Sequence, residues 1–89
     1  MADNWEVYII RTKSGTLYTG ITTDMERRFQ EHAGKRQGAR FFNLSAPGKI
    51  VFREKHQNRS TATRRETEIK KMTRHEKLKL IRESRELDL

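Results

Sequence analysis

Two apolar runs open the chain, at residues 5–11 and 16–21. Both are rich in Val, Ile, Tyr and Thr, the residues that favour β-strands. The short loop between them ends in Gly15, which can supply the positive φ of a three-residue hairpin turn. The pattern therefore predicts two antiparallel strands joined by a tight turn.

The hairpin register decides which side chains share a face of the sheet. If Thr12 pairs with Thr16 across the turn, Tyr8 lies opposite Gly20, and Tyr18 points to the same face as Tyr8. The glycine then leaves an open space beside the Tyr8 ring where a ligand can approach. A slip of one residue would separate the tyrosines, because side chains alternate between the two faces.

A helix is predicted after the hairpin. Thr23 and Glu26 have the spacing of a capping box, and Asp24 suits the positive end of the helix dipole. The expected buried stripe consists of Met25, Phe29 and Ala33. At 100° per residue, Arg28 and His32 fall within about 60° of Met25, whereas Arg27 points roughly opposite. A guanidinium one turn from a histidine, beside an apolar stripe, is suited to bind a phosphate-sized anion.

The second half of the chain predicts one more strand. Residues 49–56 follow the turn signal Pro47-Gly48. Simple alternation places Ile50 and Phe52 on one side of this strand and Val51 on the other. The strand would complete a small antiparallel sheet.

Two helices are predicted to follow. Ser60 is a suitable N-cap for a helix that ends near Met72. Thr73 and Glu76 form a second capping box, so a final helix begins near Arg74. Its inward side chains are Leu78 and Ile81. The predicted fold is α+β, a three-stranded antiparallel sheet flanked by helices in the order β-β-α-β-α-α. Residues 1–83 form a single domain, and residues 84–89 a frayed tail.

One acidic residue breaks the apolar stripe of the first of these helices. The stripe consists of Ala62, Ile69, Met72 and Thr73, and the angular position of Glu66 falls inside it. A buried carboxylate is costly unless a cation or a metal accompanies it. Two interpretations follow: an ion pair with Arg65, Arg28 or another base, or a ligand for a divalent metal.

Several of these residues together resemble a known signature. The match to the GIY-YIG endonuclease superfamily rests on Tyr8, Tyr18-Thr19-Gly20 and Asp24-Met25-x-x-Arg28-x-x-x-His32. A second set, Tyr18 to Asp24 with Ala62-x-x-x-Glu66-x-x-Ile69-Lys70, is similar to small single-domain bacterial GIY-YIG proteins. The likeness covers nearly the whole chain. It is imperfect, because Glu6-Val7 replaces the first Gly-Ile, Thr19 replaces an Ile, and Ile21 stands where excision-repair proteins have a lysine.

The resemblance implies a metal-dependent endonuclease, acting on DNA more than on RNA, in repair or recombination. In this pattern Tyr8 is the general base or orients the attacking water, and Arg28 holds the scissile phosphate. Glu66 holds one Mg²⁺ (or Mn²⁺). Tyr18 and His32 support them by hydrogen bonding, and Gly20 is structural. A tyrosine with a pKa near 10 is a poor base at neutral pH, so this role requires a nearby cation.

Charge adds a second reason to expect a nucleic-acid partner. The chain has 89 residues, with 20 Lys and Arg against 12 Asp and Glu, a formal net charge of +8. The candidate contacts to a phosphate backbone are Lys35, Arg36 and Arg40 in a glycine-bracketed loop, and Lys70 and Lys71 at a helix end. An ordinary solvated surface is the alternative for both groups.

Other features exclude several classes. There is no cysteine, so disulfides, thiolate metal sites and thiol nucleophiles are excluded. No signal peptide or apolar span is apparent, which predicts a cytoplasmic protein with no membrane contact. No separate targeting domain fits in the chain, so specificity would come from the domain surface, an oligomer or a partner protein. The alternatives to a nuclease are a non-catalytic nucleic-acid-binding module and a basic structural or ribosome-associated protein.

Overall fold

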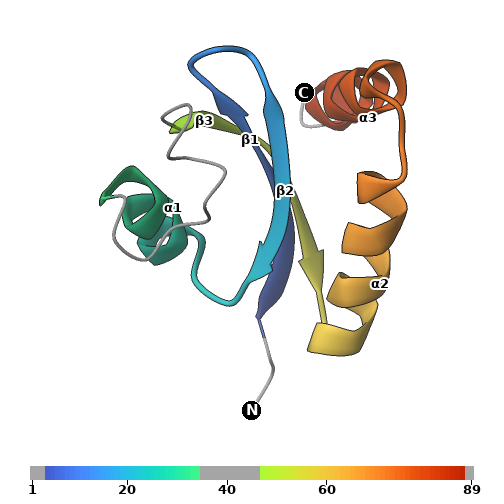
Figure 1. Cartoon of the computed structure of the whole chain (residues 1–89). Helices are drawn as coiled ribbons and strands as arrows, with labels where there is room; N and C mark the ends of the chain where they lie inside the picture. The colour runs from blue at the N-terminus through green and yellow to red at the C-terminus, as the bar shows by residue number, and fades with distance from the viewer. Residues whose placement is uncertain (1–3, 35–46, 88–89) are drawn as a thin grey trace.

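The computed structural model describes residues 4–34 and 47–87, which form a three-stranded antiparallel sheet and three helices (Figure 1). The strands run in the order β2-β1-β3. The elements are β1 (Trp5–Thr12), β2 (Leu17–Thr22), α1 (Met25–Gly34), β3 (Pro47–His56), α2 (Arg59–Lys70) and α3 (Arg74–Leu87). The predicted α+β class and element order are confirmed.

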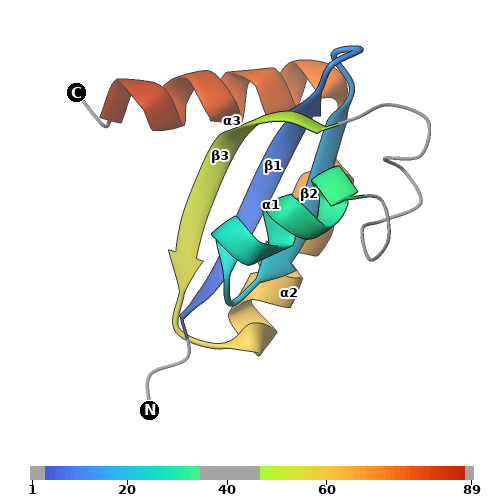
Figure 2. The same cartoon turned by 90° about the vertical axis from the view of Figure 1, so that its left-hand side faces the viewer.

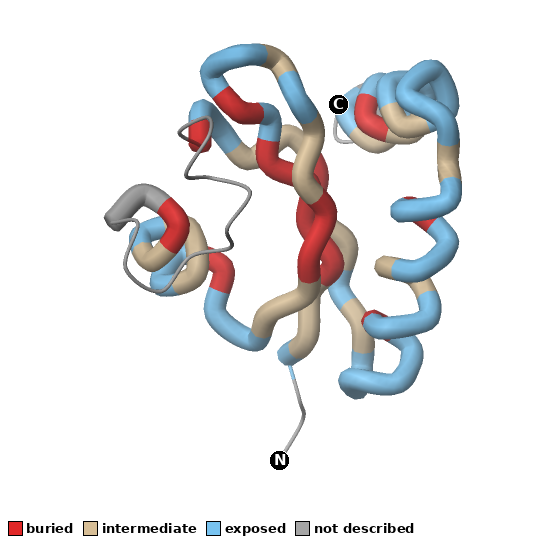
Figure 3. Tube along the Cα trace, in the orientation of Figure 1, coloured by how far each residue is buried: buried red, intermediate tan, exposed pale blue. Residues whose placement is uncertain are grey.

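The sheet is the middle layer of the molecule. Helix α1 covers one face, and α2 and α3 cover the other (Figures 1 and 2). Side chains of the central strand β1 alternate between them: Val7 and Ile9 pack towards α2 and α3, and Tyr8 and Ile10 pack towards α1. Buried residues therefore concentrate along the middle of the sheet (Figure 3).

The hairpin has the predicted register. The Thr12 amide donates to the Thr16 carbonyl at 2.8 Å, and Tyr8 lies opposite Gly20. Gly15 has a φ of +93°, a conformation that a residue with a Cβ rarely adopts. The turn thus fixes the register that brings the two tyrosines to the α1 face.

Helix α1 begins with a different cap from the one predicted. Asp24, not Thr23, is the N-cap, because its Oδ1 accepts a hydrogen bond from the Arg27 amide at 3.1 Å. The Asp24 amide in turn donates to Thr22 Oγ1 at 3.1 Å. Several polar residues stand side by side here, and sequence alone did not show which one takes the capping backbone conformation.

Strand β3 departs from simple alternation. Its pairing with β1 shifts between Ile9 and Ile10, which lie opposite Phe52 and Ile50. This bulge around Val51 lets both Val51 and Phe52 pack with the cluster beneath α2 and α3, while Ile50 packs on the α1 side. The predicted separation of Val51 from Phe52 was therefore wrong.

Helix α2 differs from the prediction as well, because it starts earlier. Its N-cap is Asn58, whose side chain accepts from the Thr61 amide at 2.9 Å, and not Ser60. The helix ends at Lys70, and Thr73 is exposed, so Thr73 does not belong to the buried stripe. The stripe that remains is anchored by Ala62 and Ile69, both fully buried.

Helix α3 has the predicted capping box. The Glu76 amide donates to Thr73 Oγ1 at 3.2 Å, and the Thr73 amide donates to the Glu76 carboxylate at 2.8 Å. Ile81 is buried as expected, but Leu78 is 45% exposed. The helix continues to Leu87, so residues 84–87 are helical where a frayed tail was predicted. Within the described ranges, no helix is long and apolar enough to cross a membrane.

One buried polar group supports a stability prediction. Thr19 is 4% exposed, and its Oγ1 has no hydrogen-bond partner among the described residues. Thr19→Val removes this hydroxyl at nearly constant shape and should raise the free energy of unfolding by about 1 kcal/mol, a gain of about 4–8 °C in Tm. Thermal unfolding followed by circular dichroism measures the change. Thr22→Val, which deletes a hydroxyl that accepts a hydrogen bond, should lower Tm. A lower Tm for Thr19→Val would show that the hydroxyl is satisfied.

Candidate active site

The α1 face of the sheet brings the two tyrosines together with His32. Tyr8 Oη lies 3.1 Å from Nε2 of His32, and both residues are almost completely buried. Tyr18 joins them through its ring, whose centroid is 5.3 Å from that of His32 and 6.3 Å from that of Tyr8. Two strands and one helix thus assemble a single aromatic cluster.

Gly20 makes room for this cluster. A Cβ at this position would lie 2.5 Å from Tyr8 Oη and 2.7 Å from Cζ of the same ring. The space predicted for a ligand beside the glycine is therefore filled by the Tyr8 hydroxyl itself. Any larger residue at position 20 would displace the Tyr8 ring, so the glycine is what allows the ring to lie here.

Arg28 reaches the cluster from α1. Its side chain is 31% exposed, against 75% for its neighbour Arg27, as the helical phase predicted. It hydrogen-bonds to Tyr8, and its Nη1 donates to Oε1 of Glu31 at 3.1 Å. Burial alone would lower the pKa of Arg28, but these hydrogen bonds raise it above the ordinary value.

Glu31 was missed in the sequence. It accepts from Arg28 and also lies 3.4 Å from the Arg27 guanidinium. The signal was present, because residues three and four positions apart are neighbours on a helix. Glu31 holds Arg28 on the side of the helix that faces Tyr8.

Burial shifts the pKa values of Tyr8 and His32 in opposite directions. It raises the pKa of Tyr8 to about 12, against the lowering effect of the Arg28 hydrogen bond. Burial, followed by the Arg28 charge, lowers the pKa of His32 to about 4. At neutral pH the tyrosine is therefore a phenol and the histidine a neutral imidazole.

These protonation states leave two arrangements for the hydrogen bond between Tyr8 and His32. Arg28 can only donate, so Tyr8 Oη accepts from it. When the Tyr8 hydroxyl donates to Nε2 of His32, the imidazole proton lies on Nδ1; in the other tautomer Nε2 donates to Oη. In the first arrangement, one lone pair of Oη is left to accept a further hydrogen bond.

The low pKa of His32 predicts acid sensitivity. Between its ordinary pKa of 6.5 and about 4, the unfolded chain takes up a proton that the folded protein excludes. This stabilising contribution, about 3 kcal/mol, is complete above pH 6.5, declines as the pH falls and levels off below pH 4. Urea unfolding at several pH values tests this. The decline between pH 6.5 and 4.5 should be much shallower in His32→Gln and unchanged in His75→Gln, which alters an exposed histidine. Equal slopes in all three proteins would contradict the prediction.

Glu66 approaches from the other side of the sheet. It belongs to α2, which packs against β1 and β2, and its side chain is 20% exposed. Lys70 lies one turn along the helix, with Nζ 3.3 Å from Oε2 of Glu66. The predicted partner Arg65 instead pairs with Glu54 at 3.1 Å. Burial is the main cause of the raised pKa of Tyr8, and the negative charge of Glu66 adds only a small contribution.

Glu66 could bind a metal ion that keeps most of its water ligands. The described residues do not offer a complete set of protein ligands for a metal. In the described part of the chain, no group of three or more His, Asp and Glu side chains could hold a metal. A single carboxylate suits Mg²⁺, which keeps several waters and takes the remaining ligands from substrate phosphates. Lys70 is 57% exposed, so its side chain is free to move when a cation binds to Glu66.

The structure describes only two of the five cations that were predicted to contact a phosphate backbone. Lys70 and Lys71 are both exposed at the end of α2, and Lys70 is paired with Glu66. The loop residues Lys35, Arg36 and Arg40 lie outside the described residues. The part of the predicted positive surface that the structure describes is therefore the end of α2.

The fold and the cluster define a small α+β domain with a tyrosine–histidine–arginine site on one face of its sheet. Residues 4–79 match the family model of the GIY-YIG catalytic domain. The chain therefore belongs to the GIY-YIG family, a family of nucleases.

Similar proteins are equally small. The chain is 42% identical over 80 residues to the UPF0213 protein of Desulfotalea psychrophila, covering 90% of this chain and 73% of that protein. It is 41% identical over 81 residues to the UPF0213 protein of Staphylococcus saprophyticus, covering 91% and 98%. The solution structure of the UPF0213 protein BH0048 from Bacillus halodurans is 36% identical, with a TM-score of 0.57, and the match covers 88% of this chain and 82% of that one.

Proposed function

We propose that this protein is a metal-dependent endonuclease that hydrolyses phosphodiester bonds, with DNA as its preferred substrate. One observation carries the proposal: the buried Tyr8 Oη lies 3.1 Å from Nε2 of His32, and the partly exposed guanidinium of Arg28 hydrogen-bonds to the same tyrosine. A tyrosine that only fills the core needs a hydrogen-bond partner, but it does not need a phosphate-binding cation beside it. Membership of the GIY-YIG family gives this arrangement its chemical meaning.

Tyr8 orients the attacking water in this proposal. Its free lone pair accepts a hydrogen bond from the water while its own hydrogen is given to His32 Nε2, 3.1 Å away. When the water attacks phosphorus, its proton passes to Tyr8 Oη and the Tyr8 proton passes to the neutral His32, whose low pKa in the free protein rises once the phosphate anion is bound beside it. The pKa of about 12 favours this over a standing tyrosinate, because it keeps Tyr8 protonated in the free protein.

Arg28 binds the scissile phosphate. Its side chain is 31% exposed and so can reach a substrate, and its guanidinium matches the geometry of phosphate oxygens. Glu31 and Tyr8 hold it in place before substrate binds. Tyr18 packs against His32 and keeps the imidazole oriented.

Glu66 would hold one Mg²⁺ or Mn²⁺ on the leaving-group side. When bound, such an ion neutralises charge on the phosphate and stabilises the departing oxygen. Glu66 lies on α2 beside the basic end formed by Lys70 and Lys71, which would contact the nucleic-acid backbone. We also propose that a protein partner contributes specificity, that the enzyme works in the cytoplasm, and that it serves DNA repair or recombination.

A non-catalytic nucleic-acid-binding module is the second candidate. Two observations favour it: Tyr8 is 1% exposed, and Glu66 already has Lys70 as a partner. Such a module would keep salt-sensitive binding and cut nothing.

A panel of end-labelled substrates separates the two functions. Single-stranded, duplex and branched DNA, with RNA of the same sequence, are incubated with the purified protein in Mg²⁺, in Mn²⁺ or in EDTA. The nuclease predicts metal-dependent products from at least one DNA. Binding to all four without products in either metal would establish the module.

A further inference from the structure

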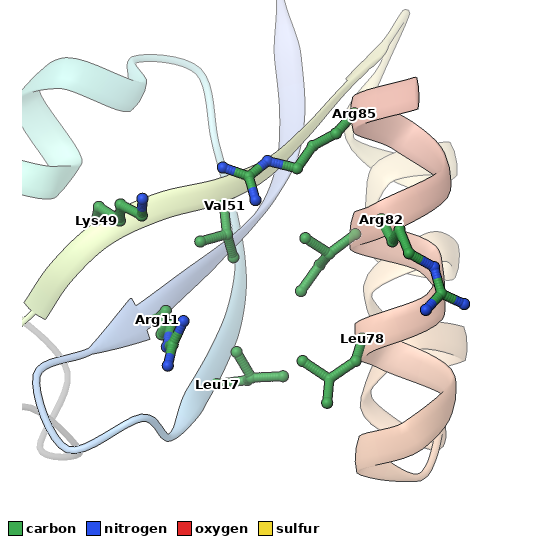
Figure 4. Close-up of a pocket in the computed structure, with 8 residues that line it drawn as sticks. Arg11, Leu17, Lys49, Val51, Leu78, Arg82 and Arg85 are labelled. Carbon is green, nitrogen blue, oxygen red and sulfur yellow. The ribbon is translucent and has the colours of Figure 1, made fainter. Parts of the chain in front are cut away.

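A groove lies on the face of the sheet opposite the tyrosine cluster, between α3 and the hairpin end of the strands (Figure 4). Its volume is about 510 Å³, within the range of pockets that bind ligands. Tyr18 and Leu17 are neighbours in β2, and their side chains point to opposite faces. A molecule in the groove would therefore leave the tyrosine cluster on the other face open.

The floor of the groove is aliphatic. It consists of Leu17, Val51, Leu78 and Ile81, contributed by β2, β3 and α3. Leu17 and Leu78 point towards one another across it (Figure 4). Leu78 is the exposed large hydrophobic residue in the described part of the chain, at 45%. The predicted inward packing of Leu78 is thus only half achieved within this chain, and the remaining surface faces the groove.

The rim of the groove is entirely cationic. Arg11 and Lys49 line it from the strands, and Arg82 and Arg85 from α3 (Figure 4). Among the described residues, no carboxylate lines the groove. None of the four cations forms an ion pair with another described residue. The rim therefore offers positive charge on both sides of an apolar floor.

We propose that this groove binds an acidic amphipathic peptide segment of a partner protein. Aliphatic side chains on one face of a helical segment would fill the floor, and flanking Asp and Glu would pair with the rim. A nucleic acid fits less well, because a phosphate backbone has no apolar group to fill the aliphatic floor, and no described lining residue is aromatic and could stack on an unpaired base. The proposal is independent of the proposed nuclease activity.

The test uses the full chain and a defined probe. The probe is a fluorescein-labelled peptide of about 15 residues with Leu at i, i+3, i+4 and i+7 and Glu or Asp at most other positions. Two further probes are the same peptide with Gln in place of each acid, and a single-stranded DNA of matched negative charge. Fluorescence anisotropy at fixed salt measures each dissociation constant.

The variants separate the floor from the rim. Leu78→Ser and Arg82→Glu should each weaken binding of the acidic peptide by about tenfold, which is about 1.4 kcal/mol. Lys79→Glu makes the same charge change on α3 outside the groove and should alter affinity by less than about twofold. Circular dichroism confirms that each variant is folded.

The proposal predicts tight binding of the acidic peptide, weak binding of the Gln peptide and loss in both groove variants. It is overturned if the acidic peptide does not bind, or if Lys79→Glu weakens it as much as Arg82→Glu. It is also overturned if Arg82→Glu weakens binding of the DNA more than binding of the peptide while Leu78→Ser leaves binding of the DNA unchanged. That result would make the groove a phosphate-binding surface.

Discussion

Tyr8→Phe should lower the cleavage rate by about 10²–10⁴-fold, the range typical of a lost proton-transfer group. The substitution keeps the ring and removes Oη, so the water loses its acceptor and Arg28 loses one of its partners. His32 Nε2 is left buried without its hydrogen bond, which should cost about 1–2 kcal/mol of stability.

Single-turnover cleavage with the preferred substrate measures this effect. Thr19→Val is the control: it removes from the neighbouring strand a buried hydroxyl that has no hydrogen-bond partner among the described residues, so the cleavage rate should be unchanged. A folded Tyr8→Phe protein that cuts at the wild-type rate would remove Tyr8 from the chemistry.

Glu66→Gln should abolish metal-dependent cleavage, with a loss of about 10³-fold at fixed Mg²⁺. The amide is nearly the same shape but is a poor ligand for a hard cation, and several kcal/mol of charge stabilisation in the transition state are lost. Because Lys70 loses its partner, binding of nucleic acid should stay the same or increase slightly.

Glu68→Gln is the control for this substitution. Glu68 lies on the same helix, its side chain is 60% exposed and it makes a long ion pair with Arg65 at 3.8 Å. Its loss should leave cleavage and its dependence on metal concentration unchanged. If Glu66→Gln has the same metal dependence as the wild type, the metal is held elsewhere or is not required.

The hairpin, and the pairing of residues across it, were predictable from the sequence because two local signals agree. The β-rich runs set the strands, and the glycine turn set the register that joins Tyr8 and Gly20. Helical phasing likewise placed Arg28 inward and Arg27 outward. These features depend on spacing along the chain, which the sequence contains.

Other features depend on contacts between distant elements. The bulge at Val51 is a feature of the pairing between β3 and β1, which alternation along one strand does not show. The N-caps at Asp24 and Asn58 were each chosen from several polar neighbours by backbone conformation. Errors of this kind moved helix ends by a few residues and left the fold unchanged.

The sequence indicated which residues make up the candidate site, but it did not indicate their burial or their pKa values. The family pattern named Tyr8, but its burial and pKa of about 12 arise from packing beneath α1. The partner of Glu66 could have been found, because Lys70 is four residues further along the same helix. The position of Glu66 relative to Tyr8 could not, since it depends on how α2 packs on the sheet.

The central claim is that this chain itself cuts nucleic acid with the residues around Tyr8. The most direct measurement is cleavage of end-labelled branched DNA in Mg²⁺ by wild-type, Tyr8→Phe and Glu66→Gln proteins, each purified in parallel through the same steps. The account predicts products from the wild type alone, suppressed by EDTA, with all three proteins folded and bound to the DNA. Equal cleavage by all three, or none by any of them on any substrate of the panel, would contradict it.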